Sequence, residues 1–563
     1  MLWHGAAMTT RLLAALLALS CSAAALPAQP VREPQQRPAP KLIVAISVDQ
    51  LSADLFAQYR QHFTGGLRRL SQGVVFASGY QAHAATETCP GHSTILTGSR
   101  PARTGIIANN WYDLSAGRED KYLYCAEDER VAGSTSENYT VSPYHLRVPA
   151  LGDHMRRAYP ASRAVAVAGK DRAAVMMGGH SPTQRWWWGG REFVSHAGAA
   201  APAAVAPVNA RVTQALAAAR EPDALVPLCE ARSRAIPVEG GGGAVGEGRF
   251  AREPGNRNAF RASPDFDAAV LDLARRLRDE MRLGQGAAPD LLAIGLSATD
   301  YVGHTYGTQG SEMCLQLLAL DRALGEFFAY LDGTGVDYLV MLTADHGGHD
   351  IPERVRQQAG PDSARVDPAL DARAMGEAIG RELGLPGRLL FGDGAFGDMY
   401  VSRDIPEAAR RRVRDEAVRR YREHPQVAAV FTREQLAAAP GPSGPPDSWT
   451  LIQRARASFD PERSGDLLVL LRPRVVPIHD TSRGYTTTHG SPWDYDRRVP
   501  ILFWRRGLTP FEQPLSVETV DILPTLAALI GVTIPAGTID GRCLDLIEGP
   551  ETSCPASAQE MQR

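Results

Sequence analysis

The sequence has few cysteines and no surplus of charge of either sign. Seven of its 563 residues are cysteine, and no two stand in the C-x-x-C spacing of common zinc motifs. Lys and Arg total 60 against 63 Asp and Glu, a formal net charge of -3, and no basic stripe carries interleaved aromatics. No apolar run is long enough to span a bilayer comfortably. We therefore expect neither nucleic acid as a main partner nor a transmembrane segment.

The N-terminus is typical of an export signal. Met8 to Arg11 form a short basic region, the apolar run LLAALLALS follows, and small residues up to Ala28 offer cleavage sites. Cys21 follows a poor match to a lipoprotein box, which disfavours a lipid anchor. We predict a signal peptide over residues 1–28, a flexible Pro- and Gln-rich segment over 29–40, and a periplasmic or secreted protein.

Export permits disulfides between the six cysteines that remain after cleavage. Six cysteines allow 15 full pairings, and the sequence does not choose among them. Cys543 and Cys554 are the nearest pair, so a short C-terminal disulfide is plausible.

Strand-like and helix-like segments alternate through most of the chain. Continuous apolar runs such as LIVAISV, LLAIGLS and YLVMLT are typical of buried parallel strands, and EMCLQLLALDRALGEFFAYL has the spacing of an amphipathic helix. This alternation predicts an α/β fold with a doubly wound, mainly parallel central sheet flanked by helices, with cap insertions.

Changes in composition divide the mature chain into core and inserted parts. Residues 112–264 hold Trp186 to Trp188 and an Ala-rich stretch, and we expect them to cover the site rather than to extend the sheet. Residues 351–477 are less regular and predict a second insertion. The predicted core segments are 41–111, 265–350 and 478–563.

Six candidate metal ligands lie in four short pieces of the chain. Three of these pieces end predicted strands, and parallel strands bring their carboxyl ends to one edge of a sheet. Three Asp and three His suffice for two zinc ions, each with three or four N and O ligands. The candidates are Asp49, Asp300, His304, Asp345, His346 and His489. His349 and His92 rank lower, as neighbours of the site.

A threonine near this set is the candidate nucleophile. Thr88 precedes a Pro-Gly pair and the helix-capable STILTG, and the positive end of a helix dipole suits phosphate. Thr is a weak nucleophile unless its alkoxide is stabilised, as a metal can do. Taken alone, Thr88 is more simply a helix cap. The nearby ligand set favours the catalytic interpretation.

Together these pieces resemble the alkaline phosphatase superfamily, and in particular its phosphate-irrepressible (PafA-type) alkaline phosphatases. The matching pieces run in family order over nearly the whole mature chain: SVDQ (Asp49), TCPGHSTILTG (Thr88), GIIANNWYD (Asn109), GKDR (Lys170 and Arg172), TDYVGH (Asp300 and His304), TADHGG (Asp345 and His346) and THG (His489). Single pieces such as ADHGG are shared across the superfamily, whereas the set with GKDR is more specific.

The resemblance implies a role for each matching residue. One zinc would be held by Asp49, Asp345 and His346 and would also contact Thr88. Asp300, His304 and His489 would hold the other. Thr88 would attack phosphorus to form a phosphothreonine, which water activated by zinc would hydrolyse.

Three further side chains would hold the transferred phosphoryl group. Asn109 offers an amide donor, with Asn110 as an off-by-one alternative, and Lys170 and Arg172 offer positive charge. A Lys–Arg pair favours the extra charge of a monoester dianion. The resemblance therefore implies phosphate monoesters as substrates and inorganic phosphate as a product inhibitor.

Other functions stay open at this point. Nucleotide pyrophosphatase/phosphodiesterases resemble the chain in the Thr, Asn and metal positions but would present an apolar pocket in place of GKDR. A sulfatase would need C-x-P-x-R, which is absent around Cys89, and a phosphoglycerate mutase-like enzyme is hard to reconcile with export. A secreted metal- or carbohydrate-binding protein could use Trp186 to Trp188 as a platform, although packing against the core is the simpler role for them.

Overall fold

A computed structural model describes residues 38–196, 200–358, 360–548 and 551–555. The predicted signal peptide and most of the predicted flexible segment lie outside the described residues. From Ala39 onward, the described residues form one compact unit. No helix among the described residues is both long enough and apolar enough to cross a membrane.

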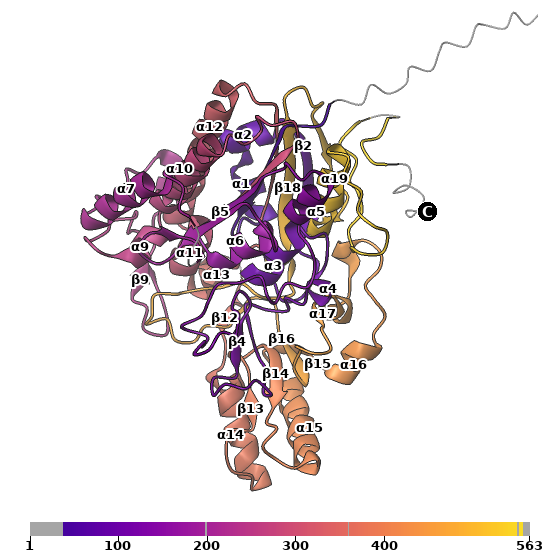
Figure 1. Ribbon diagram of the computed structural model, residues 1–563. Helices are drawn as coiled ribbons and strands as arrows, with labels where there is room; N and C mark the ends of the chain where they lie inside the picture. The colour runs from indigo at the N-terminus through magenta and orange to yellow at the C-terminus, as the bar shows by residue number, and fades with distance from the viewer. Residues whose placement is uncertain (1–37, 197–199, 359, 549–550, 556–563) are drawn as a thin grey trace, which may run out of the picture. The chain divides into compact units, whose positions relative to one another are not determined.

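A large sheet runs through this unit, and its central strands are parallel (Figure 1). β1 lies between β11 and β10, and β10 continues to β5 and β6, all in parallel register. β18 pairs antiparallel with β11 and β2. In sheet order the strands are β19 (Phe511–Gln513), β2 (Val74–Tyr80), β18 (Arg498–Arg505), β11 (Tyr338–Thr343), β1 (Leu42–Val48), β10 (Asp290–Leu296), β5 (Ala164–Ala168), β6 (Gln184–Trp188) and β7 (Phe193–Val194), with β20 (Val517–Glu518) paired to β2.

Helices cover both faces of this sheet because its strands are apolar on both sides. In β1, Leu42, Val44 and Ile46 join one buried cluster, whereas Ile43 and Ala45 join the other. Alternate strand residues point to opposite faces, so a continuous apolar run must be covered twice. The predicted doubly wound, mainly parallel α/β fold is confirmed.

The helices sort by the cluster that their apolar residues join. The first face is covered by α1 (Ala53–Tyr59), α2 (Gly66–Leu70), α7 (Val205–Ala217), α8 (Pro227–Glu230), α9 (Arg257–Arg261), α10 (Pro264–Glu280), α11 (Ala298–Tyr306) and α12 (Ser311–Gly333). The second is covered by α3 (Thr88–Ile95), α5 (Leu151–Ala158), α6 (Asp171–Gly178) and α19 (Ile522–Leu529). The short helices α4 (Pro101–Thr104), α13 (Pro352–Gln358) and α18 (Asp494–Arg497) lie in connections.

The predicted second insertion has a sheet and a core of its own. A buried cluster that includes Leu390, Val413 and Val469 packs this sheet against α14 and α15. Figure 1 draws both helices below the central sheet. The elements are β13 (Leu390–Phe391), β14 (Gly397–Val401), β16 (Leu467–Leu471) and β15 (Val427–Thr432), with α14 (Ala372–Leu383), α15 (Glu407–Glu423), α16 (Arg433–Ala438) and α17 (Leu451–Ser458).

One expectation for the first insertion is wrong. We expected residues 112–264 to cover the site rather than to extend the sheet, but β5, β6 and β7 belong to the central sheet. The run AVAVA is itself typical of a strand, but a local pattern does not show which sheet a strand joins. Trp186, Trp187 and Trp188 form most of β6 and are 4, 6 and 7% exposed, as core packing predicts.

Three short ribbons and three disulfides complete the described part of the fold. The ribbons pair β3 (Asn110–Tyr112) with β4 (Tyr122–Tyr124), β8 (Ile236–Pro237) with β9 (Ala244–Val245), and β12 (Ala364–Arg365) with β17 (Val475–Val476). The disulfides join Cys89 to Cys125, Cys229 to Cys314, and Cys543 to Cys554. The Cys543–Cys554 pairing is confirmed.

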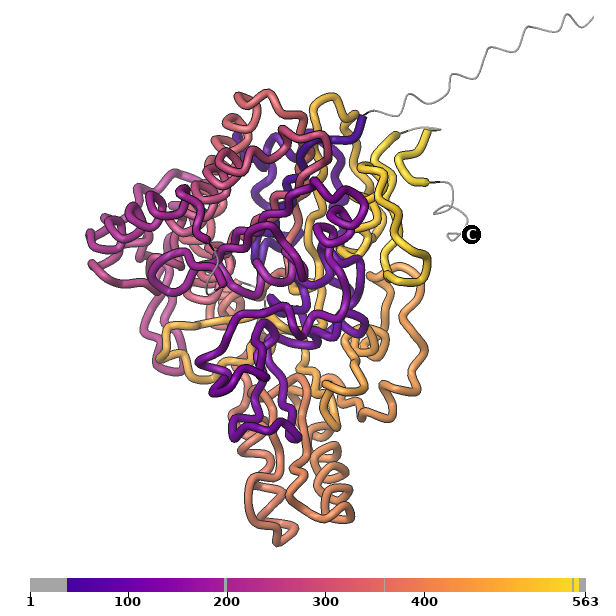
Figure 2. The backbone as a smooth tube through the Cα atoms, in the orientation of Figure 1, coloured from indigo at the N-terminus to yellow at the C-terminus, as the bar shows by residue number. Residues whose placement is uncertain are grey.

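Segments distant in sequence lie side by side beneath the sheet. The β3–β4 ribbon contacts the second insertion, where the Tyr112 ring lies 5.5 Å from Phe391 and 5.9 Å from Tyr400. Figure 2 shows the two backbones running together.

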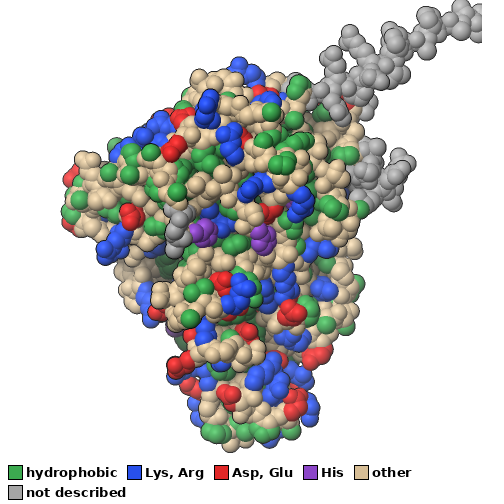
Figure 3. All heavy atoms as spheres, viewed as in Figure 1, with side chains coloured by type: hydrophobic (Ala, Val, Ile, Leu, Met, Phe, Trp, Pro, Cys, Tyr) green, Lys and Arg blue, Asp and Glu red, His purple; other side chains and the backbone are tan. Residues whose placement is uncertain are grey.

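On the face drawn in Figure 3, Lys and Arg are interspersed with Asp and Glu, in line with the small net charge.

Candidate active site

The six predicted metal ligands gather at the carboxyl ends of adjacent strands. Asp49 directly follows β1, and Asp345 and His346 follow β11. Asp300 lies not at a strand end, as predicted, but in the first turn of α11, which follows β10, so His304 lies one helical turn further on. Because β11, β1 and β10 are parallel neighbours, these side chains converge at one edge of the sheet.

The buried acidic and imidazole groups form two clusters. One cluster contains Asp300, His346 and His489, and the rings of His346 and His489 stack at 3.5 Å. The other contains Asp49, His92 and Asp345. His304 Nε2 lies 3.3 Å from Asp300 Oδ1 but belongs to neither cluster. His349 is in neither cluster as well, and its ring packs against Tyr495 at 4.9 Å.

These clusters divide the ligands differently from the sets that the resemblance implies. His346 lies with Asp300 and His489 rather than with Asp49 and Asp345. The ligand assignment is thus still a prediction, but the convergence of the residues is an observation.

The donor atoms suit a divalent metal. Five buried atoms in the clusters make no hydrogen bond of acceptable geometry: both carboxylate oxygens of Asp49, Oδ2 of Asp345, and Nε2 of His92 and His346. Each of these atoms instead lies 3.0–3.2 Å from a carboxylate, imidazole or ammonium group of the same site, and N and O ligands are those that zinc binds. The two clusters therefore fit a two-metal site.

Lys170 brings positive charge between the two clusters. Its Nζ lies 3.0 Å from Asp49 Oδ2 and 2.5 Å from Asp300 Oδ2. Burial alone would lower the pKa of Lys170, but the carboxylates of Asp300 and Asp49 raise it above its ordinary value. The side chain therefore carries its charge at the centre of the site.

His92 lies beside the predicted ligands, as expected for a neighbour of the site, and contacts two of them. It extends from α3 so that Nε2 lies 3.2 Å from Asp49 Oδ1 and Nδ1 lies 3.2 Å from Asp345 Oδ2. Burial lowers the pKa of His92, but these two carboxylates outweigh it and raise that pKa to about 10. The helical position of His92, one turn after Thr88, was the only signal available in the sequence.

Thr88 begins α3 and faces the two basic side chains predicted to accompany it. Its Oγ1 lies 3.4 Å from Lys170 Nζ and 3.4 Å from an Arg172 guanidinium nitrogen. The helix starts at Thr88 itself, so Pro90 and Gly91 lie in its first turn rather than in a turn before it. A Cβ on Gly91 would approach the Asp345 carbonyl oxygen to 2.0 Å, so glycine lets α3 pack against the metal-ligand loop.

Asn109 and Asn110 face different partners. The side-chain oxygen of Asn109 accepts a 2.8 Å hydrogen bond from the backbone N–H of Cys89, the residue after Thr88, so its NH₂ group is not engaged by this bond. Asn110 instead hydrogen-bonds Asp393 of the second insertion. The Cys89–Cys125 disulfide fastens β4 to α3 at the same point.

A tyrosine missed by the sequence reasoning contacts Arg172. The Tyr124 hydroxyl donates to Asp171 Oδ1 at 2.6 Å and lies 3.4 Å from an Arg172 guanidinium nitrogen. Tyr139 donates to the other Asp171 oxygen at 2.8 Å. Asp171 of the GKDR motif thus faces two tyrosines rather than the site.

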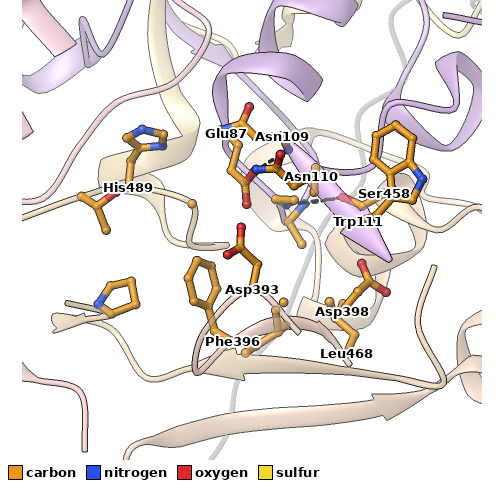
Figure 4. Close-up of a pocket in the computed structure, with 18 of the residues that line it drawn as sticks. Glu87, Asn109, Asn110, Trp111, Asp393, Phe396, Asp398, Ser458, Leu468 and His489 are labelled. Atoms are coloured by element: carbon orange, nitrogen blue, oxygen red, sulfur yellow. Dashed lines mark hydrogen bonds between the residues drawn. The ribbon is translucent and has the colours of Figure 1, made fainter. Parts of the chain in front are cut away.

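A cavity of about 460 Å³ leads away from these groups. Arg172, Asp300, His304 and His489 line one side, and residues of the second insertion line the other, as Figure 4 shows in part. Its walls include Glu87, Asp393, Phe396, Asp398 and Leu468. A ligand bound at Thr88 would have room for a substituent in this cavity.

Comparison with known proteins gives consistent matches over almost the whole chain. Residues 43–492 match the type I phosphodiesterase / nucleotide pyrophosphatase family. The chain is 58% identical to the alkaline phosphatase PhoK of a Sphingomonas species over 92% of each chain. It is 48% identical to the alkaline phosphatase PhoD of Zymomonas mobilis over 92% of this chain and 89% of that protein.

The crystal structure of the alkaline phosphatase PafA superposes with a TM-score of 0.77, at 25% identity, over 90% of this chain and 98% of PafA. A second PafA structure is of a variant altered at a threonine, an asparagine, a lysine and an arginine, in that chain order.

Proposed function

This chain belongs to the type I phosphodiesterase / nucleotide pyrophosphatase family, and on that premise we propose that it is an exported, zinc-dependent alkaline phosphatase. Its substrates are phosphate monoesters, and Thr88 is the nucleophile. The names of PhoK, PhoD and PafA support the activity. Thr, Asn, Lys and Arg are also the residue types altered in the PafA variant, in the order of Thr88, Asn109, Lys170 and Arg172.

One observation carries the proposal. Thr88 Oγ1 lies at a helix N-terminus within 3.4 Å of both Lys170 Nζ and Arg172, beside two clusters of acidic and imidazole groups. A nucleophile, anion donors and metal-binding groups are the three parts that phosphoryl transfer needs.

The predicted ligands Asp49, Asp345 and His346, with Thr88, would hold one zinc, and Asp300, His304 and His489 the other. Bound zinc would supply positive charge to activate the Thr88 hydroxyl and to stabilise the leaving oxygen. His92 contacts both Asp49 and Asp345 and would orient them toward the metal.

The protein's own residues then act on the phosphoryl group. Thr88 Oγ1 forms a bond to phosphorus as the ester oxygen departs with its electron pair. Water later forms a bond to phosphorus and Thr88 departs. Throughout both steps, Asn109, Lys170 and Arg172 donate to the non-bridging oxygens, where charge must be stabilised. Inorganic phosphate would bind the same donors and inhibit.

Phosphodiester hydrolysis is the alternative, because the matching family takes its name from it. A diester carries one negative charge fewer on the phosphoryl group than a monoester dianion. Lys170 and Arg172 both reach Thr88 Oγ1, and two cationic donors at the nucleophile favour the dianion. We therefore favour monoesters.

A secreted binding protein is the alternative from another class. Its proposed Trp platform is buried in β6, and so is not available as a surface. Export itself rests on residues 1–28, outside the described part of the chain.

Trapping the covalent intermediate tests the mechanism. Wild-type protein quenched in acid during turnover of p-nitrophenyl phosphate should yield a peptide phosphorylated on Thr88. Thr88→Ala should lose at least ~1000-fold in kcat/KM while retaining bound zinc, because it lacks the nucleophile but keeps the Asp and His ligands. Full activity of Thr88→Ala, with unchanged metal content, would contradict the proposal.

A further inference from the structure

The cavity near Thr88 has basic side chains at one end and carboxylates along the rest of its wall. Arg172 lines the end near which the phosphoryl group would bind, and Lys170 lies behind that end, where both side chains reach Thr88 Oγ1. Three carboxylates line the rest of the cavity: Glu87, Asp393 and Asp398. Figure 4 shows the carboxylates of Glu87 and Asp393 pointing toward one another across the cavity.

These three carboxylates lack the ion pairs with basic side chains that most acidic groups of this protein form. Within the described part of the chain, none of them forms an ion pair with Lys, Arg or His. Each has neutral hydrogen-bond donors instead: Glu87 accepts from Asn109 N at 2.6 Å, Asp398 accepts from Gly465 N at 2.6 Å, and Asp393 is hydrogen-bonded by Tyr122 and Asn110. This part of the cavity wall therefore gathers three carboxylates without a cationic partner among the described residues, while Arg172 and Arg261 lie elsewhere in the lining.

Aromatic faces stand among the carboxylates. Phe396 points into the cavity in Figure 4, and Tyr112, Tyr400 and Phe459 line it as well. Carboxylates combined with aromatic faces attract ammonium groups, because both present negative potential to a cation. The same wall repels an anionic substituent.

We propose that this cavity is a leaving-group subsite that selects phosphate monoesters of amino or quaternary-ammonium alcohols over monoesters whose leaving group carries a second negative charge. The phosphoryl dianion is held at the basic end, and the ammonium group extends to the carboxylates of the wall. The proposal rests on the proposed function, since it assigns the leaving-group end of the same site. Asp393 is its principal selectivity residue, because its side chain is exposed to the cavity and comes from the second insertion.

A matched pair of substrates separates the effect of the positive charge on the leaving group from the effect of its shape. Phosphocholine is compared with its neutral carbon isostere, the ester in which carbon replaces the quaternary nitrogen, at pH 9 with the zinc-loaded enzyme. Intrinsic reactivity differs between the two esters, so the readout is the change in their kcat/KM ratio on mutation. Asp393→Asn should lower the phosphocholine/isostere ratio about tenfold, because it removes one negative charge in a partly enclosed site. Hydrolysis of the isostere should change less than about twofold.

Two further variants complete the experiment. Asp404→Asn removes an exposed carboxylate of the same insertion that does not line the cavity, and it should leave the ratio unchanged. Asp393→Lys should invert the preference, so that a monoester with a carboxylate on its leaving group gains over phosphocholine. It also serves as the second test should Asp393→Asn misfold.

The outcomes separate this inference from the proposed function. If the wild-type enzyme hydrolyses the neutral isostere but the ratio does not respond to either Asp393 variant, the subsite assignment is wrong and the phosphatase activity stands. If the wild-type enzyme hydrolyses no monoester, the proposed function itself fails.

Discussion

At the scale of single residues, the orientation of Arg172 depends on the side chains that touch it. Tyr124 lies between Asp171 and Arg172, and its hydroxyl can accept from the guanidinium while donating to the carboxylate. A guanidinium recognises phosphate through a planar fork, so its orientation governs how much charge reaches the transferred group. We infer that Tyr124 is a positioning residue for Arg172.

Replacing Tyr124 tests this role. Tyr124→Phe keeps the ring that packs on Tyr139 at 4.7 Å but removes the hydroxyl, and it should lower kcat/KM for a monoester about 5–20-fold, with a smaller loss for a diester. Tyr139→Phe removes the other Asp171 partner without touching Arg172 and should leave the monoester/diester ratio unchanged.

Arg172→Ala provides the reference for this comparison. Arg172→Ala should lower kcat/KM for the monoester more than Tyr124→Phe does. In the double variant, Tyr124→Phe should lower kcat/KM little further, because the tyrosine acts through the arginine. Additive losses in the double variant would show that Tyr124 acts independently.

At the scale of elements, α11 depends on a buried carboxylate at its start. Asp267 of α10 accepts a 2.9 Å hydrogen bond from Ala298 N, the first residue of α11, and a 3.1 Å bond from Gln316 of α12. It thereby fixes the helix that carries Asp300 and His304. Burial, with a smaller contribution from Asp49, raises the pKa of Asp267 to about 7.

This raised pKa predicts a pH-dependent stability. The folded protein holds the Asp267 proton up to about pH 7, whereas the unfolded chain loses it near pH 4, so ionisation destabilises the folded state as pH rises between these values. Asp267→Asn cannot ionise, and its amide can donate to the Gln316 oxygen, which lacks a partner. The free energy of unfolding of wild type relative to Asp267→Asn should therefore fall by up to about 4 kcal/mol between pH 4 and pH 7.

Urea unfolding of both proteins at several pH values would measure this difference. A difference that is constant over the window would mean that Asp267 titrates near its ordinary pKa in the folded protein.

The elements also show where sequence reasoning was reliable. Long apolar runs predicted β1, β10 and β11, because strands buried on both sheet faces need apolar residues at every position. The amphipathic pattern predicted α12, because a helix buried along one face needs apolar residues at helical spacing. The strand character of AVAVA was predicted, but its place in the central sheet with β6 and β7 was not, since a local pattern does not show which sheet a strand joins.

At the scale of the whole molecule, the metal site joins parts of the fold that are far apart in sequence. Asp49, Asp300 and Asp345 are all buried, and they follow three different strands of the central sheet, β1, β10 and β11. Buried carboxylates repel one another unless cations compensate them, and Lys170 provides one such charge. Bound metal should therefore stabilise the complete fold as well as support catalysis.

Metal removal provides the corresponding test. EDTA treatment should lower Tm by several degrees and abolish turnover, and added zinc should restore both, because a ligand that binds only the folded state stabilises it by mass action. Asp300→Asn should show a smaller zinc-dependent change in Tm, with less zinc bound by elemental analysis. An unchanged Tm after complete metal removal would argue against a structural contribution.

The sequence by itself determined the α/β class, the main strands, the ligand candidates at strand ends, Thr88 and the GKDR pair, because each is encoded in local spacing and residue type. Only the tertiary structure decided that His92 lies between Asp49 and Asp345, that Tyr124 contacts Arg172, and that Cys89 pairs with Cys125. It also decided that Asp393 of the second insertion faces Glu87. These contacts join segments whose approach depends on strand register and on how the second insertion packs beneath the sheet, and no local pattern encodes either.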